Sequence, residues 1–228
     1  MMTDAQWQRL SALTGIAFAI LMVVAFSVQG ILPQADEPQA DVVRYFSTYH
    51  DDVMGGVLIR VAAGVFFLWF IGTLRSVLAA AEGGTGRLAN VAFGAGILML
   101  AAGMGAMASL ASIAYNAERG VDPGFASSML AMTHIFFVGG AMGMAWLLFA
   151  TAFVVVRTRV FSRWVASSGA IIGIIAIGLG LVAPAGTSGV SAYPLFILWV
   201  VALSILMMRE DPDRDRTAPH ASTRAPDG

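Results

Sequence analysis

Five long stretches of the chain contain no charged residue and are strongly apolar. They run over Leu10–Ala35, Val61–Leu74, Leu88–Ala117, Pro123–Val156 and Trp164–Met208. A membrane-spanning helix needs about 20 apolar residues to cross about 30 Å of hydrocarbon. Four stretches reach that length, the second can be extended at one end, and the last is long enough for two crossings. The pattern therefore predicts an all-α, polytopic membrane protein with a bundle of six transmembrane helices.

The six predicted helices form one domain over residues 1–208. They are expected near Leu10–Leu32, Val53–Leu74, Ala89–Tyr115, Ser127–Val156, Val165–Val182 and Ser191–Met208. The first lies where a signal peptide would, but no small-x-small cleavage site follows it cleanly, so we interpret it as an uncleaved anchor. Residues 209–228 are rich in Arg, Asp, Pro, Ser and Thr without apolar periodicity, which predicts a disordered tail.

A short amphipathic helix is expected outside the membrane after the first span, over about residues 36–52. Its apolar face is formed at steps of four, three and four residues by Val42, Phe46, Tyr49 and Val53. The opposite face is polar and charged, so the helix is expected to lie flat at the outer membrane surface and to end at Gly55–Gly56. A role as a lid or as a partner surface is the alternative.

The distribution of arginine predicts the orientation. The chain has no lysine, and all 13 basic residues are arginine. Connections on one side of the predicted bundle hold Arg75, Arg87, Arg157, Arg159 and Arg163, whereas those on the other hold only Arg44 and Arg119 among several acids. Because positively charged loops stay on the cytoplasmic side, both termini are predicted to be cytoplasmic.

Several classes of chemistry are not supported by the sequence. The absence of cysteine removes disulfides, thiolate metal sites and cysteine nucleophiles. All 14 acidic residues lie outside the predicted spans, so no pair of carboxylates that would support an enzyme is expected inside the membrane. Three adjacent potential ligands, His50, Asp51 and Asp52, fan out around a helix and favour a solvated helix end over a metal site. The tail alternates Asp and Arg, which does not favour nucleic-acid binding. We predict a non-enzymatic protein without a metal or another cofactor.

Polar residues at similar depth in four predicted helices form the candidate ligand-binding site. Arg60 and His134 lie about two turns below the outer ends of the second and fourth helices, on faces of small residues. Gln29 of the first helix and Ser112 and Asn116 of the third fall at similar depth. An ionisable side chain inside a membrane is a functional candidate. These residues predict one outward-facing cavity, with interhelical hydrogen bonding or snorkelling without a ligand as the alternative.

Small residues recur at four-residue spacing within the spans. Examples are Ala101, Gly105 and Ser109, then Gly139 and Gly143, then Gly169 and Gly173. Such spacing lets helix backbones approach closely where lipid provides no hydrophobic drive for association. We expect these faces to pack within the bundle, and contact with other membrane subunits or with a second copy is the alternative.

Two segments carry a family resemblance: FFLWFIGTLRSVLAAAEGGTGRLANVAFG from Phe66 to Gly94, and VVVRTRVFSRWVASSGAIIG from Val154 to Gly173. They resemble a broad group of uncharacterised six-helix membrane proteins that is abundant in actinobacteria. The resemblance covers about Leu10 to Met208. It implies an outer amphipathic helix after the first span, an Arg-rich inner turn and an Arg-Trp start to the fifth helix, and it brings no established activity.

Two functional hypotheses follow from these patterns. In the first, the protein is a scaffold or accessory subunit of a membrane assembly in the lipid bilayer, and its intramembrane polar residues pair with one another. In the second, it is a small transporter or binding protein that admits an anionic or amphipathic molecule from the outer face. Arg60 then provides charge and His134 a titratable contact, and both side chains face an open cavity.

Overall fold

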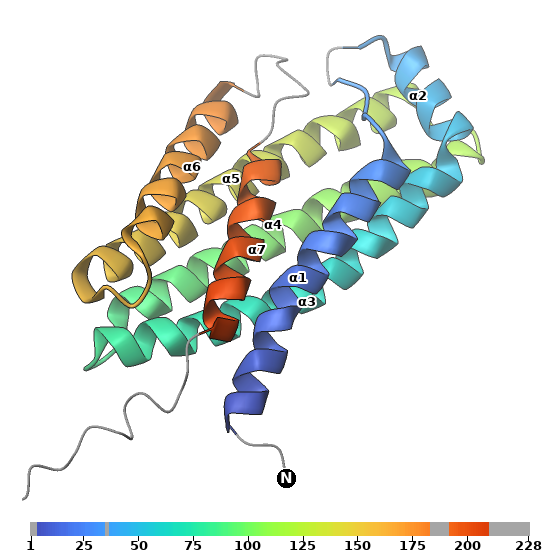
Figure 1. Ribbon diagram of the computed structural model, residues 1–228. Helices are drawn as coiled ribbons and strands as arrows, with labels where there is room; N and C mark the ends of the chain where they lie inside the picture. Colours follow the sequence, from blue (N-terminus) through green and yellow to red (C-terminus); the bar gives the residue numbers. More distant parts are fainter. Residues whose placement is uncertain (1–3, 35–36, 183–191, 210–228) are drawn as a thin grey trace, which may run out of the picture.

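A computed structural model describes residues 4–34, 37–182 and 192–209, and this part of the chain is entirely helical outside its turns (Figure 1). Its seven helices are α1 (Asp4–Gln29), α2 (Gln39–Thr48), α3 (His50–Glu82), α4 (Arg87–Ala117), α5 (Pro123–Thr158), α6 (Arg163–Val182) and α7 (Tyr193–Arg209). The predicted all-α bundle is confirmed. The tail from residue 210 and the predicted helix start at Ser191 lie outside the described residues.

Four of these helices, α3 to α6, are long and apolar enough to cross a membrane. The apolar part of α1, Leu13–Gln29, and the whole of α7 are shorter. The long helices exceed the predicted spans at one or both ends. Their polar ends extend past the apolar stretch because a helix continues until a capping residue or a turn ends its backbone hydrogen bonding.

Side chains and glycines define the ends of the long helices. Asp122 caps α5, where its carboxylate accepts a hydrogen bond of 2.9 Å from a backbone N–H of the first turn, and proline follows it. In the turn between α3 and α4, Gly83 and Gly86 have φ of 69° and 58°. Glu82 reaches across this turn and accepts a hydrogen bond of 3.0 Å from the N–H of Leu88, which satisfies an otherwise unpaired donor at the start of α4.

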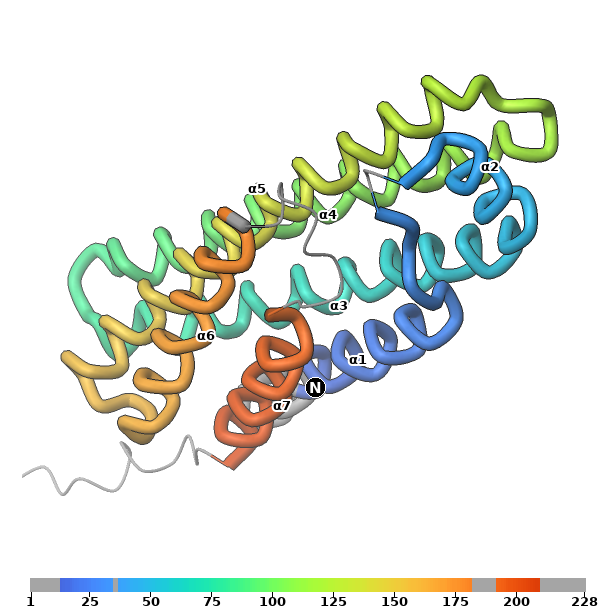
Figure 2. Tube along the Cα trace, turned by 90° about the horizontal axis from the view of Figure 1, so that it is seen from above, coloured from blue at the N-terminus to red at the C-terminus, as the bar shows by residue number. Residues whose placement is uncertain are grey.

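The six helices other than α2, here called the six long helices, form a ring in chain order. Each of α1, α3, α4, α5 and α6 packs against the next, and α7 closes the ring against α1 (Figures 1 and 2). The α4–α5 contact is the most extensive and the α6–α7 contact is the thinnest. At that thin contact, the indole of Trp199 donates a hydrogen bond of 3.2 Å to the carbonyl oxygen of Val165, beside Gly169.

Glycines of the predicted small-residue faces lie at contacts inside the bundle. An ideal Cβ at Gly143 of α5 would lie 2.6 Å from the backbone nitrogen of Met99 in α4. One at Gly173 of α6 would lie 2.7 Å from the ring of Phe149 in α5. These positions therefore set the spacing of neighbouring helices in one chain, as close packing in lipid requires.

The outer amphipathic helix is shorter than predicted. α2 covers Gln39–Thr48 and is interrupted at Tyr49, which has φ of −111° and ψ of 30°. His50 already belongs to α3, and that helix continues through Gly55–Gly56, so the predicted helix end there is wrong. A glycine costs a helix only about 1 kcal/mol. At Gly56 an ideal Cβ would lie 2.8 Å from the Cβ of Gln29, so this glycine permits close packing of α3 on α1.

The apolar face of α2 packs on the bundle. Val42 and Phe46 are buried in a cluster with Val53 of α3 and with apolar side chains of α4 and α5, including Leu110 and Leu130. Phe46 is completely buried. The helix is amphipathic, as expected, but protein covers the apolar face that was expected to rest on lipid. α2 therefore covers one end of the bundle (Figure 1).

Candidate functional site

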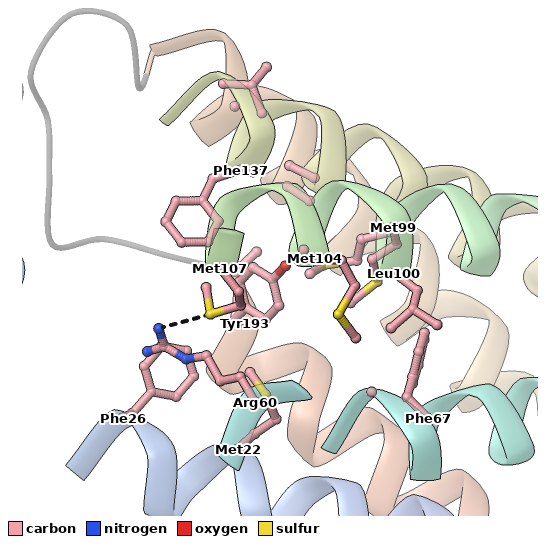
Figure 3. Close-up of a pocket in the computed structure, with 18 of the residues that line it drawn as sticks. Met22, Phe26, Arg60, Phe67, Met99, Leu100, Met104, Met107, Phe137 and Tyr193 are labelled. Atoms are coloured by element: carbon pink, nitrogen blue, oxygen red, sulfur yellow. Dashed lines mark hydrogen bonds between the residues drawn. The ribbon is translucent and has the colours of Figure 1, made fainter. Parts of the chain in front are cut away.

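A cavity of about 390 Å³ lies inside the ring and is lined by residues of all six long helices (Figure 3). Its wall is mainly apolar and includes five methionines, Met22, Met99, Met104, Met107 and Met144, and four phenylalanines, Phe18, Phe26, Phe67 and Phe137. None of the described lining residues is acidic. The lining also includes Ile31, which is 87% exposed, so the cavity reaches the molecular surface beside the end of α1.

Arg60 supplies the only permanent charge among the described lining residues. Its guanidinium lies 4.7 Å from the ring centroid of Phe26, and Nη1 lies 3.9 Å from the sulfur of Met107 (Figure 3). Cation–π contact of this kind is worth about 0.5–2 kcal/mol. Within the described part of the chain, no carboxylate lies within ion-pair distance of this side chain. The cation is therefore held by soft, neutral groups and keeps hydrogen-bond donors available.

His134 lies in the lining of the same cavity. Its Nδ1 is 2.8 Å from the carbonyl oxygen of Leu130, one turn earlier in α5. A carbonyl oxygen can only accept, so Nδ1 carries the proton and Nε2 of the neutral ring is an acceptor. The imidazole can therefore offer an acceptor when neutral and a second donor when protonated.

Tyr193 is a lining residue that the sequence analysis did not identify. It begins α7, and its ring makes an edge contact with Phe26 at a centroid distance of 6.4 Å. Its hydroxyl oxygen is 3.5 Å from the ideal Cβ of Gly140 in α5. The available signal was its place at the outer end of the last predicted span.

The other three candidate residues are not in the cavity lining. Gln29 is 2% exposed and lies beside Gly56 of α3, and its side-chain amide has no hydrogen-bond partner in the described structure. Asn116 donates from Nδ2 to the carbonyl oxygen of Ser112 at 2.8 Å, within α4. At about 100° per residue, these two α4 residues are turned roughly 140–180° from Met107, which does line the cavity. The sequence predicted that these two residues lie at a depth similar to that of Arg60, but their side of α4 faces away from the cavity.

α2 is attached to α1 near the mouth of the cavity. The hydroxyl of Tyr45 donates a hydrogen bond of 2.9 Å to the carbonyl oxygen of Gln29. Burial raises the pKa of the Tyr45 phenol. The nearby Tyr49 and Asp52 raise this pKa further, whereas the positive charge of Arg60 lowers it. The phenol is protonated at neutral pH even at the ordinary tyrosine pKa, and the shift acts in the same direction, so the hydroxyl is a donor to the end of α1.

The fold and the cavity together define the class of protein: an all-helical bundle, with four helices able to cross a membrane, around an apolar chamber that holds one arginine. Comparison of the chain with protein-family models, curated proteins and solved structures finds no match. The functional argument therefore rests on the residues of the cavity.

Proposed function

We propose that this protein binds a small anionic, amphipathic molecule in its central cavity, as a binding protein or a small transporter of the bacterial plasma membrane. The observation that carries the proposal is Arg60, which lies at a mostly apolar cavity and, in the described part of the chain, has no carboxylate within ion-pair distance. A charge in apolar surroundings is costly unless a counter-charge or hydrogen bonds compensate it. An anionic ligand would supply both, and its apolar part would bury against methionine and phenylalanine.

The arrangement of the polar residues favours binding over a purely structural role. A scaffold without a ligand requires that the intramembrane polar groups satisfy one another. In the described structure, Arg60 contacts a ring and a thioether, and His134 bonds its own helix. Pockets of about 300–1,000 Å³ with apolar walls and few polar groups are typical of small-molecule sites.

We propose six membrane spans with both termini in the cytoplasm. The apolar part of α1, Leu13–Gln29, has 17 residues and extends about 26 Å, close to the hydrocarbon thickness of about 30 Å. The 17 residues of α7 extend about 26 Å, close to that thickness. Both helices belong to the same ring as the four spanning helices, and the start of α1 and the end of α7 lie at the same end of the bundle (Figure 1).

Reporter fusions test this orientation. Fusions after Gly84 and after Arg159 are expected to be active only with a cytoplasmic reporter, because these turns lie in the arginine-rich connections. Fusions near Asp41 and Asp122 are expected to be external. An active external reporter at Gly84 would contradict the proposed topology.

Removing the charge of Arg60 tests the binding proposal. In phosphatidylcholine nanodiscs, decanoate is expected to raise the melting temperature of the wild-type protein, and decanol, which has no charge, to raise it much less. Arg60→Gln is expected to weaken decanoate binding by about 10- to 100-fold, because a charged hydrogen bond contributes about 1.5–3 kcal/mol. Its melting temperature without ligand should change little, since the substitution also removes an uncompensated charge.

The matched control is Arg44→Gln, which removes an exposed arginine on α2 that pairs with Asp41 at the surface. This variant is expected to bind decanoate like the wild type. Equal stabilisation of the wild type and Arg60→Gln by decanoate would show that the charge does not recognise the ligand, and the proposal would then fail.

A further inference from the structure

We infer that the cavity selects its ligand by the length of a single alkyl tail, with the anionic head at Arg60 and the tail passing Gly103 toward Phe67. This inference rests on the proposed binding function and adds a direction and a length to it. The ligand class is a single-tailed amphiphile with a carboxylate or phosphate head.

The cavity has two chemically different ends. Arg60, Phe26 and Met107 lie together at one end, and Phe67, Leu100 and Met99 lie at the other (Figure 3). The charge is confined to the first end, where the lining also reaches the surface near Ile31. A charged head is therefore favoured there, and an apolar tail is favoured at the other end because burial of each CH₂ group is worth about 0.8 kcal/mol.

The helical rise gives the distance between these ends. Met107 and Met99 are about two turns apart on α4, roughly 12 Å. An extended chain advances about 1.2 Å per bond, as the peptide backbone does, so a tail of roughly ten bonds spans the cavity. The volume of about 390 Å³ lies at the low end of small-molecule pockets, which favours one tail over two.

Gly103 is the position on α4 where the tail would pass. It lines the cavity, and an ideal Cβ there has no atom within 4 Å. It shares the face of α4 with Met99 and Met107, which are four residues away on either side. By contrast, a Cβ at Gly64 of α3 would lie 2.6 Å from the Cε of Met104. A larger side chain at Gly103 would therefore occupy the passage without a clash near its own backbone.

The test measures tail-length preference in phosphatidylcholine nanodiscs by thermal stabilisation with hexanoate, decanoate and tetradecanoate. The wild type is expected to prefer decanoate. Gly103→Leu is expected to weaken decanoate binding by about tenfold or more while hexanoate binding stays within about twofold, so that the preference moves to the shorter acid. Gly103→Ala, a smaller change, is expected to shift the preference in the same direction by less, and it is available if the leucine variant folds poorly.

Gly94→Leu is the matched control on the same helix. Gly94 is exposed, does not line the cavity and also has open space at its Cβ position. Its replacement is expected to leave the preference for decanoate unchanged. If Gly94→Leu moved the preference as far as Gly103→Leu, the selection would not arise at the cavity and the inference would be overturned.

The remaining outcomes separate the inference from the proposed function. If none of these acids stabilises the wild type and Arg60→Gln changes nothing, the proposed function fails. If the acids bind through Arg60 but Gly103→Leu keeps the preference for decanoate, only the length selection fails. Decyl phosphate added in water and lysophosphatidic acid built into the nanodisc separate a free amphiphile from a membrane lipid. A shift of the tail preference in Gly103→Leu supports the inference with either source.

Discussion

Replacement of Gly143 with alanine is expected to lower the free energy of unfolding by about 1–3 kcal/mol, the cost of overpacking a tight interior. The new Cβ would lie 2.6 Å from the backbone nitrogen of Met99 and 2.9 Å from the carbonyl oxygen of Ala95. These atoms belong to the backbone of α4, so no side-chain rotation relieves the contact. The two helices must move apart along the most extensive contact of the ring. Thermal unfolding in nanodiscs measures the loss.

Gly72→Ala is the matched control for this prediction. Gly72 lies in α3, and an ideal Cβ there meets nothing within 4 Å. Alanine is the better helix former by about 0.5–1 kcal/mol, so this variant should be as stable as the wild type or more stable. If the two alanine variants unfolded at the same temperature, the close approach of α4 and α5 at Gly143 would be contradicted.

Phe46→Ala is expected to detach α2 from the end of the bundle. Phe46 is completely buried between α2 and the α4–α5 pair, and truncation of a buried phenylalanine costs about 3–5 kcal/mol. α2 has only 10 residues, which is too few for a stable isolated helix, so it depends on its packing against the bundle. Loss of the buried phenyl ring should therefore remove most of the free energy that holds α2 in place. Hydrogen exchange and limited proteolysis between Ala40 and Asp52 should both accelerate.

Tyr49→Ala serves as the control for α2, because Tyr49 is 48% exposed although it belongs to the same sequence stripe. Its replacement should leave the exchange rates of α2 nearly unchanged. Slow exchange in Phe46→Ala, equal to that of the wild type, would mean that α2 is held by contacts other than its buried aromatic ring.

Most of the helices could be predicted because long charge-free apolar stretches favour helices. Charge-free stretches located the six long helices, and the observed ends extend past them at polar residues such as Arg87 and Glu82. The end of α2 could not be predicted from Gly55–Gly56. A glycine pair is typical of helix ends, but here Gly56 is kept inside α3 by its packing against α1. The pattern of the chain contains no information on that contact.

The sequence predicted how far along each helix the candidate residues lie, but only partly which of them face the cavity. Distance along a span follows from counting residues, and this placed Arg60 and His134 at the level where the cavity is found. Direction depends on which face of each helix its neighbours leave open. Ser112 and Asn116 face away because α4 presents Gly103 and the adjacent methionines to the cavity instead. Methionine carries no polar signal, so the apolar wall was not identified from the sequence.

The thioether wall makes the chamber sensitive to oxidants. Methionine is a flexible, polarisable side chain, and its oxidation to the sulfoxide adds a strong dipole and a chiral centre at the sulfur atom. Met107 is the most consequential of the five lining methionines, because its sulfur lies 3.9 Å from the guanidinium of Arg60. A sulfoxide oxygen at that position would accept a hydrogen bond from the arginine and compete with an incoming anion. A sulfoxide at Met107, which is 5% exposed, would thus weaken the proposed anion binding at Arg60.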